Sequence, residues 1–478
     1  MYTTEPRSRI TSMRLKMGRE KFNRLIFAFT FYFALLSSVV AAQESTPRLP
    51  PPPAQQPGVI PSPTPLQIIE PSVLTDALVA QVPEEKPMLW QGVLVETLDG
   101  EIVMQERANQ TFNPASAIKL ATALQALRTF GPQHRFATAV WSTGTFDQTT
   151  GTVTGDLIVS GRDPSFHYEH AVSIAREMNR LGIRTVTGDL IVAPGFTMNF
   201  SSSALRSGER FYDTLDATRR PAAATRAWLE NRQAVSDAAG FQTQPSVAVM
   251  GAVYIDSVPA GARPVLTHRS SALVDVLKVL LCYSNNFMAE RLGDSLGGAA
   301  GLRRFLTTDL KIPAIDLRVA STSGLGVNRV TPRGMMTVYR ALLNELAKHR
   351  LSPSDIMPVA GIDPGTLQKR FESSASRGSV IAKTGTLNRT DGGASALVGE
   401  MRTRDGETLL FVVFNGHGSV RRFRVLQDRL LADLQYERGG PAVYAYSPQT
   451  LAMRLTDTEF DPATRAGDGE YEPAPRQQ

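Results

Sequence analysis

Three short motifs, widely separated along 478 residues and in a defined order, constrain this chain most strongly. They read S-x-x-K, S-x-N and K-T-G, and are carried by Ser116-Ala117-Ile118-Lys119, Ser284-Asn285-Asn286 and Lys383-Thr384-Gly385. S-x-x-K alone is weak evidence, because it is expected on the order of once by chance in a chain of this length. The ordered triple is strong evidence, and it predicts a serine active site that works without histidine.

The first motif is expected at the start of a helix. Asn113 is a suitable N-cap, Pro114 suits the first helical position, and apolar residues follow at helical spacing. Ser116 would lie in the first turn, where the helix dipole favours negative charge. Lys119 would lie one turn further on, and it needs a lowered pKa to accept a proton, through burial or a second cation such as Lys383. The alternative is a capped amphipathic helix with a lysine in solvent.

The second motif lies between two apolar helical runs, residues 273–281 and 287–292. Polar residues at such a break suit a loop that presents side chains to a cleft. Ser284 could relay a proton to a leaving group, and the amide of Asn286 could bind a substrate peptide bond. The alternative is a simple helix cap.

The third motif is expected on a β-strand, because it follows the β-prone run 379–382 and two further strand-like segments come after it, 394–401 and 408–414. Lys383 offers a cation for a substrate carboxylate and Thr384 a hydroxyl. Gly385 would let a substrate backbone pair against the strand edge without a side chain in the way.

These motifs, with several others, resemble the low-molecular-mass class C penicillin-binding proteins, the D-alanyl-D-alanine carboxypeptidase/endopeptidase family. The further motifs that carry the resemblance are Asn113–Ser116, Gly155–Val159 with Asp163-Pro164-Ser165, Gly188–Val192, Ser284–Glu290, Ser323-Gly324-Leu325 with Asn328-Arg329, and Gly365-Thr366-Leu367 with Arg370-Phe371. The resemblance implies an α+β, penicillin-recognising (transpeptidase-like) fold. Its antiparallel sheet would be flanked by helices, with a β-rich insertion between the first and second motifs.

The resemblance also implies a role for each motif residue. Ser116 would be the acylated nucleophile, Lys119 its general base and Ser284 the proton relay. Asn286 would bind a substrate amide, and Lys383 and Thr384 the terminal carboxylate. The backbone N–H groups of Ser116 and Thr386 would form the oxyanion hole.

By the same resemblance, the chain is a serine D-Ala-D-Ala carboxypeptidase or endopeptidase that acts on peptidoglycan stem peptides and is acylated by β-lactams. The balance between carboxypeptidase and endopeptidase activity stays open. Ser321–Gly326 lacks the acidic residue and the final serine of the family pattern, and residues 387–391 are more polar than the usual continuation of this strand in the family. Two alternatives remain: a non-catalytic peptidoglycan-binding or scaffolding protein, and a β-lactamase. Fluorescent penicillin distinguishes the three possibilities. A peptidase should keep a stable label, a binding protein should take no label, and a β-lactamase should lose its label quickly.

The N-terminal segment is expected to direct export. Residues 1–42 carry seven Lys/Arg against two Glu, then an apolar stretch and a small-residue cleavage site, Val40-Ala41-Ala42, which is typical of a signal peptide. Subtracting this +5 from the formal net charge of +6 leaves about +1, so no nucleic-acid partner is expected. The predicted location is periplasmic. Association with the membrane surface through an uncleaved leader is the alternative.

The composition predicts six segments. They are the signal peptide 1–42, a proline-rich linker 43–75, the first part of the catalytic domain 76–132, an inserted β-rich accessory region 133–264, the second catalytic part 265–450 and a disordered acidic tail 451–478.

Three further patterns are interpreted as structural. Gly293–Gly297 satisfies G-x-S-x-G, but it follows a helix, whereas a nucleophile elbow follows a strand, so a glycine-containing helix end is expected. His167, His170, Asp163 and Glu169 are expected in a solvated loop rather than at a metal. The single cysteine, Cys282, is expected to be a small buried apolar residue. No cofactor or metal is implied.

Overall fold

A computed structural model describes residues 90–234 and 244–462. The predicted signal peptide and proline-rich linker lie outside the described residues, as do positions 463–478 of the predicted tail. In the part that is described, no helix combines the length and the apolar character needed to cross a membrane.

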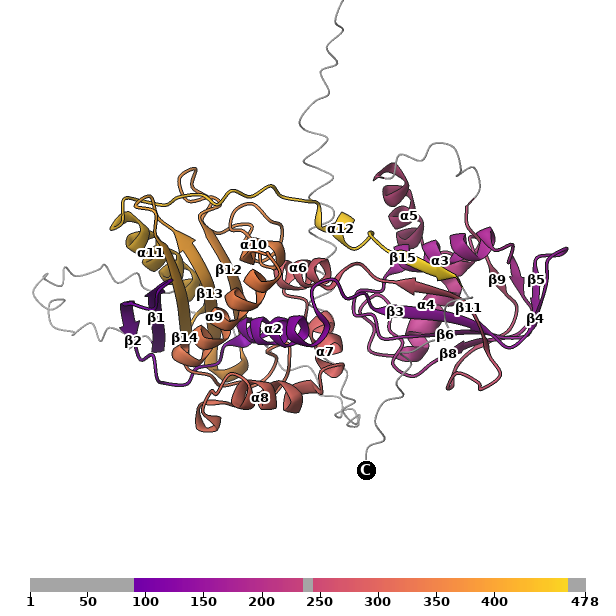
Figure 1. Cartoon of the computed structure of the whole chain (residues 1–478), viewed down its shortest axis with the longest axis horizontal. Helices are drawn as coiled ribbons and strands as arrows, with labels where there is room; N and C mark the ends of the chain where they lie inside the picture. Colours follow the sequence, from indigo (N-terminus) through magenta and orange to yellow (C-terminus); the bar gives the residue numbers. More distant parts are fainter. Residues whose placement is uncertain (1–89, 235–243, 463–478) are drawn as a thin grey trace, which may run out of the picture. The chain divides into compact units, whose positions relative to one another are not determined.

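The first sheet has five strands in the order β12-β13-β14-β1-β2, and all its pairs are antiparallel (Figure 1). The strands are β1 (Trp90–Thr97), β2 (Ile102–Glu106), β12 (Val380–Leu387), β13 (Ala394–Arg402) and β14 (Thr408–Gly416). Strands β1 and β2 form a hairpin before the nucleophile, and β1 pairs with β14. Strands from both ends of the described chain therefore meet in one sheet.

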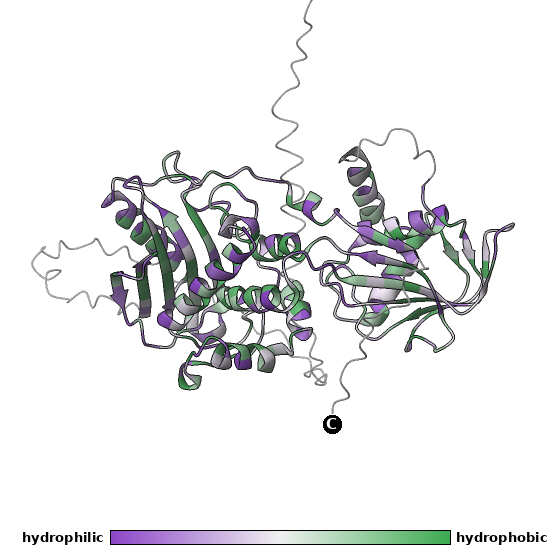
Figure 2. Ribbon diagram, in the orientation of Figure 1, coloured by the Kyte–Doolittle hydropathy of each residue, from purple (hydrophilic) through white to green (hydrophobic). Residues whose placement is uncertain are grey.

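Both faces of this sheet are buried, which explains its nearly continuous apolar strands (Figure 2). Alternate residues of one strand belong to two different hydrophobic clusters: Val412 and Phe414 to one, Phe411 and Val413 to the other. The second cluster includes Leu431 and therefore lies under α11 (Val420–Tyr436).

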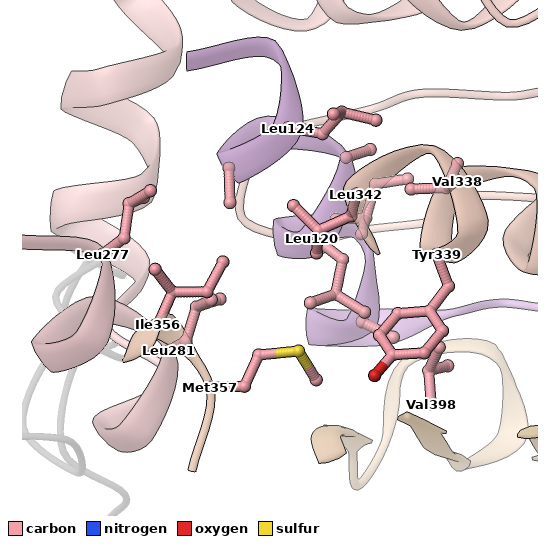
Figure 3. Close-up of a cluster of buried hydrophobic side chains, with 14 of the residues drawn as sticks. Leu120, Leu124, Leu277, Leu281, Val338, Tyr339, Leu342, Ile356, Met357 and Val398 are labelled. Atoms are coloured by element: carbon pink, nitrogen blue, oxygen red, sulfur yellow. The ribbon is translucent and has the colours of Figure 1, made fainter. Parts of the chain in front are cut away.

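Helices cover the opposite face of the sheet, where the first cluster forms the largest core (Figure 3). Leu120 and Leu124 of α2 (Lys119–Phe130) pack there with Leu277 and Leu281 of α6 (Leu273–Tyr283). The other helical segments of this part are η1 (Ala115–Ile118), α7 (Asn286–Asp294), α8 (Gly298–Thr308), η2 (Ala314–Asp316), α9 (Pro332–Lys348), α10 (Pro353–Ile356), η3 (Thr390–Gly392) and α12 (Leu451–Arg454). The antiparallel sheet between helices matches the predicted fold class.

The region between the first two motifs forms two further sheets around its own core, and β15, near the end of the described chain, completes one of them. Six strands follow the order β10-β8-β6-β3-β11-β15 and four the order β4-β5-β7-β9. The strands are β3 (Ala137–Ser142), β4 (Thr145–Asp147), β5 (Thr152–Thr154), β6 (Leu157–Gly161), β7 (Thr185–Val186), β8 (Leu190–Val192), β9 (Ala248–Val249), β10 (Val253–Ile255), β11 (Arg263–Arg269) and β15 (Glu459–Pro462). The helices are α3 (Tyr168–Arg180), α4 (Ala204–Leu215) and α5 (Ala222–Ala234). The domain boundaries predicted at residues 133 and 264 stay predictions.

The doubled G-D-L-I-V string forms two adjacent parallel strands, β6 and β8, with Leu157 opposite Leu190. The aspartate of each copy holds the next strand: Asp156 Oδ1 accepts from the N–H of Asp189 at 2.9 Å, and Asp189 Oδ1 accepts from the N–H of Ala252 at 2.6 Å. Since β10 follows Ala252 and pairs in parallel with β8, a third, diverged copy continues the stack.

The acidic tail predicted from residue 451 is wrong for residues 451–462. Leu451 and Leu455 are buried in the core of the catalytic part, and β15 pairs with β11. The acidic residues that suggested a solvated tail pair with arginines instead: Asp457 and Glu459 with Arg135, and Asp461 with Arg269. The segment is acidic because it docks against cations.

Candidate active site

Ser116 lies in a short 3₁₀ turn, η1, and not in the first turn of an α-helix as predicted; α2 begins only at Lys119. Asn113 still closes the turn, because its Oδ1 accepts from the N–H of Ala115 at 3.0 Å. Ala115 has a φ of 47°, in the left-handed region that is unfavourable for a residue with a side chain. The backbone immediately before the serine is therefore held in a costly conformation by its surroundings.

Lys119 is fully buried, and its Nζ has three hydrogen-bond acceptors. It donates to Ser116 Oγ at 2.9 Å, to Asn286 Oδ1 at 2.7 Å and to the backbone carbonyl of Ser323 at 2.5 Å. Burial and the nearby charge of Lys383 lower the pKa of Lys119 well below its usual value, and Glu290 opposes this shift. The structure thus excludes the solvent-facing lysine, and it favours the neutral amine that a base requires.

The second motif lies at the junction of two helices, as predicted. Ser284 ends α6 in the left-handed conformation, with φ 56° and ψ 40°. Asn285 caps α7, because its side chain accepts from the N–H of Met288 at 3.0 Å. The helix cap is therefore Asn285, which leaves the side chains of Ser284 and Asn286 free to contact the two lysines.

Lys383 is also fully buried, and it is placed by the edge strand β12. Its Nζ donates to Ser284 Oγ and to the backbone carbonyl of Thr384, both at 2.8 Å. Burial lowers the pKa of Lys383 to about 7. Burial thus disfavours the protonated form of the lysine that the sequence offers as a cation.

Gly385 is explained by packing against the nucleophile turn. A Cβ at this position would lie 2.4 Å from the backbone oxygen of Pro114 and 3.1 Å from the Cβ of Ala115. The glycine lets β12 approach η1 closely enough to bring Lys383 beside the first two motifs. The glycine is therefore required by the packing of the protein itself, and not only by a substrate backbone as predicted.

Thr384 and Thr386 point to the opposite side of β12 from Lys383 and Gly385, because successive side chains of a strand alternate. Thr384 is buried and Thr386 half-buried. Thr386 Oγ1 accepts a hydrogen bond from Arg424 Nη2 of α11 at 2.9 Å.

Sequence reasoning assigned no role to Glu290 and Ser323, although both were noted within motifs. Glu290 accepts from the N–H of Ser323 at 3.0 Å and from Thr322 Oγ1 at 2.9 Å, and thereby holds the carbonyl that receives Lys119. The available signal was the spacing of Asn286 and Glu290, since residues four apart share one helix face.

All eight predicted site residues come from segments that meet around two lysine–serine pairs, Lys119–Ser116 and Lys383–Ser284. Asn286 contacts Lys119, while Thr384, Gly385 and Thr386 lie on β12 beside Lys383. A buried amine of lowered pKa can take a proton from the hydroxyl 2.9 Å away, so the arrangement can generate a serine nucleophile without histidine.

The patterns interpreted as structural lie elsewhere. Ser295 follows the end of α7 and Gly297 has a φ of 87°, as expected for a glycine-containing helix end. Cys282 is a free, buried cysteine, and burial raises the pKa of its thiol to about 12.

The expected solvated loop around His167 and His170 is wrong. Asp163 and His170 are buried, and the ring of His268, on β11, lies 5.1 Å from that of His170. The surrounding aromatic core, including Phe166, encloses these residues. Among the described residues, no group of three or more His, Cys, Asp or Glu is arranged to hold a metal ion.

Comparison with known proteins identifies the same family as the motifs. The sequence model of the D-Ala-D-Ala carboxypeptidase 3 (S13) family matches residues 75–227 and 220–422. The D-alanyl-D-alanine carboxypeptidase of Actinomadura sp. (strain R39) is 27% identical over 455 residues, which cover 73% of this chain and 82% of that protein. The D-alanyl-D-alanine carboxypeptidase DacB of Haemophilus influenzae is 25% identical over 421 residues, 69% of this chain and 86% of that protein.

Solved structures share the fold. The penicillin G-acylated predatory endopeptidase Bd3459 of Bdellovibrio bacteriovorus, in complex with immunity protein Bd3460, has a TM-score of 0.65 at 21% identity, covering 76% of this chain and 96% of that one. Penicillin-binding protein 4 (dacB) of Haemophilus influenzae has a TM-score of 0.53 at 22% identity, covering 71% of this chain and 96% of that one. The family match spans most of the chain and both halves of the site, so this protein belongs to the D-Ala-D-Ala carboxypeptidase 3 (S13) family of low-molecular-mass class C penicillin-binding proteins.

Proposed function

We propose that this protein is a serine D-Ala-D-Ala carboxypeptidase that cleaves peptidoglycan stem peptides through an acyl-enzyme on Ser116, and that β-lactams acylate the same serine. The observation that carries the proposal is the buried Lys119 amine, 2.9 Å from Ser116 Oγ, in a chain of the S13 family. Endopeptidase cleavage of a D-amino-acid cross-link uses the same chemistry.

In the acylation step, the neutral amine of Lys119 takes the proton of Ser116, and Oγ attacks the carbonyl carbon of the penultimate D-alanine. The carbonyl oxygen becomes an oxyanion, which we assign to the backbone N–H groups of Ser116 and Thr386. The C–N bond then breaks. The proton that Lys119 took up is relayed through Ser284, which is hydrogen-bonded to Lys383, to the leaving nitrogen, so that Lys119 is neutral again when free D-alanine departs.

In the second step, a water molecule attacks the ester carbonyl with Lys119 again as base, and Ser116 regains its proton when the shortened peptide leaves. A β-lactam follows only the first step, because the ring nitrogen stays attached to the acyl group after the ring opens. Asn286, already bonded to Lys119, is placed to orient the substrate amide as well as the base. We further propose that the enzyme acts in the periplasm, where its substrate lies.

The test compares the native chain with Ser116→Ala and Lys119→Arg, which keeps a cation but cannot become a base. A stable fluorescent-penicillin label on the native chain alone, together with release of D-alanine from a D-Ala-D-Ala peptide, supports the proposal. Rapid loss of the label would indicate a β-lactamase. A folded native chain that takes no label and cleaves no peptide would indicate a binding protein.

A further inference from the structure

A cation that belongs to none of the three catalytic motifs contacts β12, the strand of the third motif. Arg424, on the first turns of α11, is exposed to solvent and donates from Nη2 to Thr386 Oγ1 at 2.9 Å. Among the described residues it forms no ion pair. Asp428, one turn along the same helix, is paired with Arg370 instead, at 2.8 Å between Nε and Oδ1.

Arg370 also helps to position the backbone of Arg424. Besides Asp428, it donates to Gln427 Oε1 at 3.2 Å and to the backbone oxygen of Arg424 at 3.4 Å. One arginine thus anchors the start of α11 to the segment that precedes β12, and a second arginine on α11 reaches Thr386 of the strand.

Arg424 contacts β12 on the side of the strand that faces α11. Val380 and Ala382 of this strand belong to the cluster under α11, so Thr384 and Thr386, two and four residues after Ala382, point to the same side. From Lys383 onward, β12 pairs only with β13 among the described residues. A peptide lying along this edge would therefore find two hydroxyls and a guanidinium together.

Lys383, the cation expected to bind a substrate carboxylate, is poorly suited to do so alone. It is fully buried, its Nζ is engaged by Ser284 and a backbone carbonyl, and burial lowers its pKa to about 7. A guanidinium keeps its charge at every physiological pH and can form two parallel hydrogen bonds to a carboxylate.

We propose that Arg424, together with the hydroxyls of Thr384 and Thr386, binds the terminal carboxylate of the departing D-amino acid, and so directs this enzyme toward peptides with a free C-terminus. The inference rests on the proposed function. It assigns a substrate class to the site: Arg424 favours carboxypeptidase over endopeptidase cleavage, because an internal cross-link has no carboxylate at that position.

The experiment is a cycle of two enzymes and two substrates. The native chain and Arg424→Ala are compared on a D-Ala-D-Ala peptide with a free carboxylate and on the same peptide as its C-terminal amide. We expect Arg424→Ala to lose roughly 10- to 100-fold in kcat/KM on the acid, the value of a hydrogen bond to a charged group, and less than about 2-fold on the amide. Arg424→Lys should recover part of the loss.

The matched control is Arg421→Ala. Arg421 lies one turn earlier on α11, is exposed, and has no side-chain hydrogen bond or ion pair in the described structure, so its removal should leave both rates unchanged. Acylation by penicillin methyl ester reports whether Ser116 remains competent in each variant.

Equal losses on acid and amide would overturn the inference in favour of a merely structural arginine, and so would no loss on either. Both results leave the proposed function standing, because the native chain still cleaves peptide. A native chain that cleaves neither peptide would overturn the proposed function, and the role of Arg424 with it.

Discussion

The ammonium group of Lys278 and the carboxylate of Asp363 lie 2.7 Å apart, and both side chains are completely buried. Lys278 also donates to the backbone oxygens of Ser354 and Met357, while Asp363 accepts from Tyr446 and from the N–H of Val359. The ion pair connects α6, whose C-cap is Ser284, to the segment that precedes β12.

Removing one partner should therefore be severely destabilising. Lys278→Met leaves the Asp363 carboxylate buried without its counter-charge, and we expect it to lower the free energy of unfolding by about 3–5 kcal/mol. Urea unfolding of the full chain measures this. The control is Arg429→Met, which removes an exposed ion pair with Asp433 and should change stability little. A Lys278→Met midpoint equal to that of the control would contradict the prediction.

The pH dependence of acylation should follow the two active-site lysines. Lys119 must be neutral, so kcat/KM should rise as pH increases through its strongly lowered pKa. If a protonated Lys383 supports Ser284, kcat/KM should fall again as pH passes about 7. Stopped-flow acylation by a chromogenic β-lactam across pH measures both limbs. A flat profile from about pH 5 to about pH 9 would argue against both assignments.

Glu290→Gln should shift the acid limb of that profile to lower pH. The Glu290 carboxylate stabilises the protonated form of Lys119, so its removal lowers the pKa of the lysine further. The maximal rate should also fall, because the amide cannot accept both hydrogen bonds from Thr322 and Ser323. Asp294→Asn is the control, since Asp294 lies on the same helix but pairs with Arg291 at its end. An unmoved acid limb in Glu290→Gln would refute the electrostatic link.

Gly385→Ala should abolish labelling by penicillin while the protein stays folded. The new Cβ would lie 2.4 Å from the backbone oxygen of Pro114, so β12 must move away from the nucleophile turn. Gly261→Ala is the matched control, because a Cβ there meets nothing within 4 Å. Circular dichroism checks the fold and fluorescent penicillin the site. Normal labelling of Gly385→Ala would show that the close approach of β12 is dispensable.

Local patterns predicted the elements that local physics controls. Strand-like runs predicted β13 and β14, and apolar helical spacing predicted α6 and α7. The start of α2 differs from the prediction, because the turn that Asn113 caps, η1, is a 3₁₀ turn packed against β12 and β13, and the α-helix begins only after it. Sequence reasoning also misread the segment 451–462, whose acidic residues face Arg135 and Arg269, more than 180 positions away.

The chemical groups of this site could be identified from the primary structure, because two serines, two lysines, an asparagine and a glycine lie in motifs that are short enough to recognise. The state of those groups became visible only in the folded protein. Whether Lys119 is neutral, whether Lys383 stays charged, and which arginine reaches Thr386 all depend on burial and on charges brought together from distant segments. Desolvation and Coulomb interactions act through space, so no local pattern of residues encodes them.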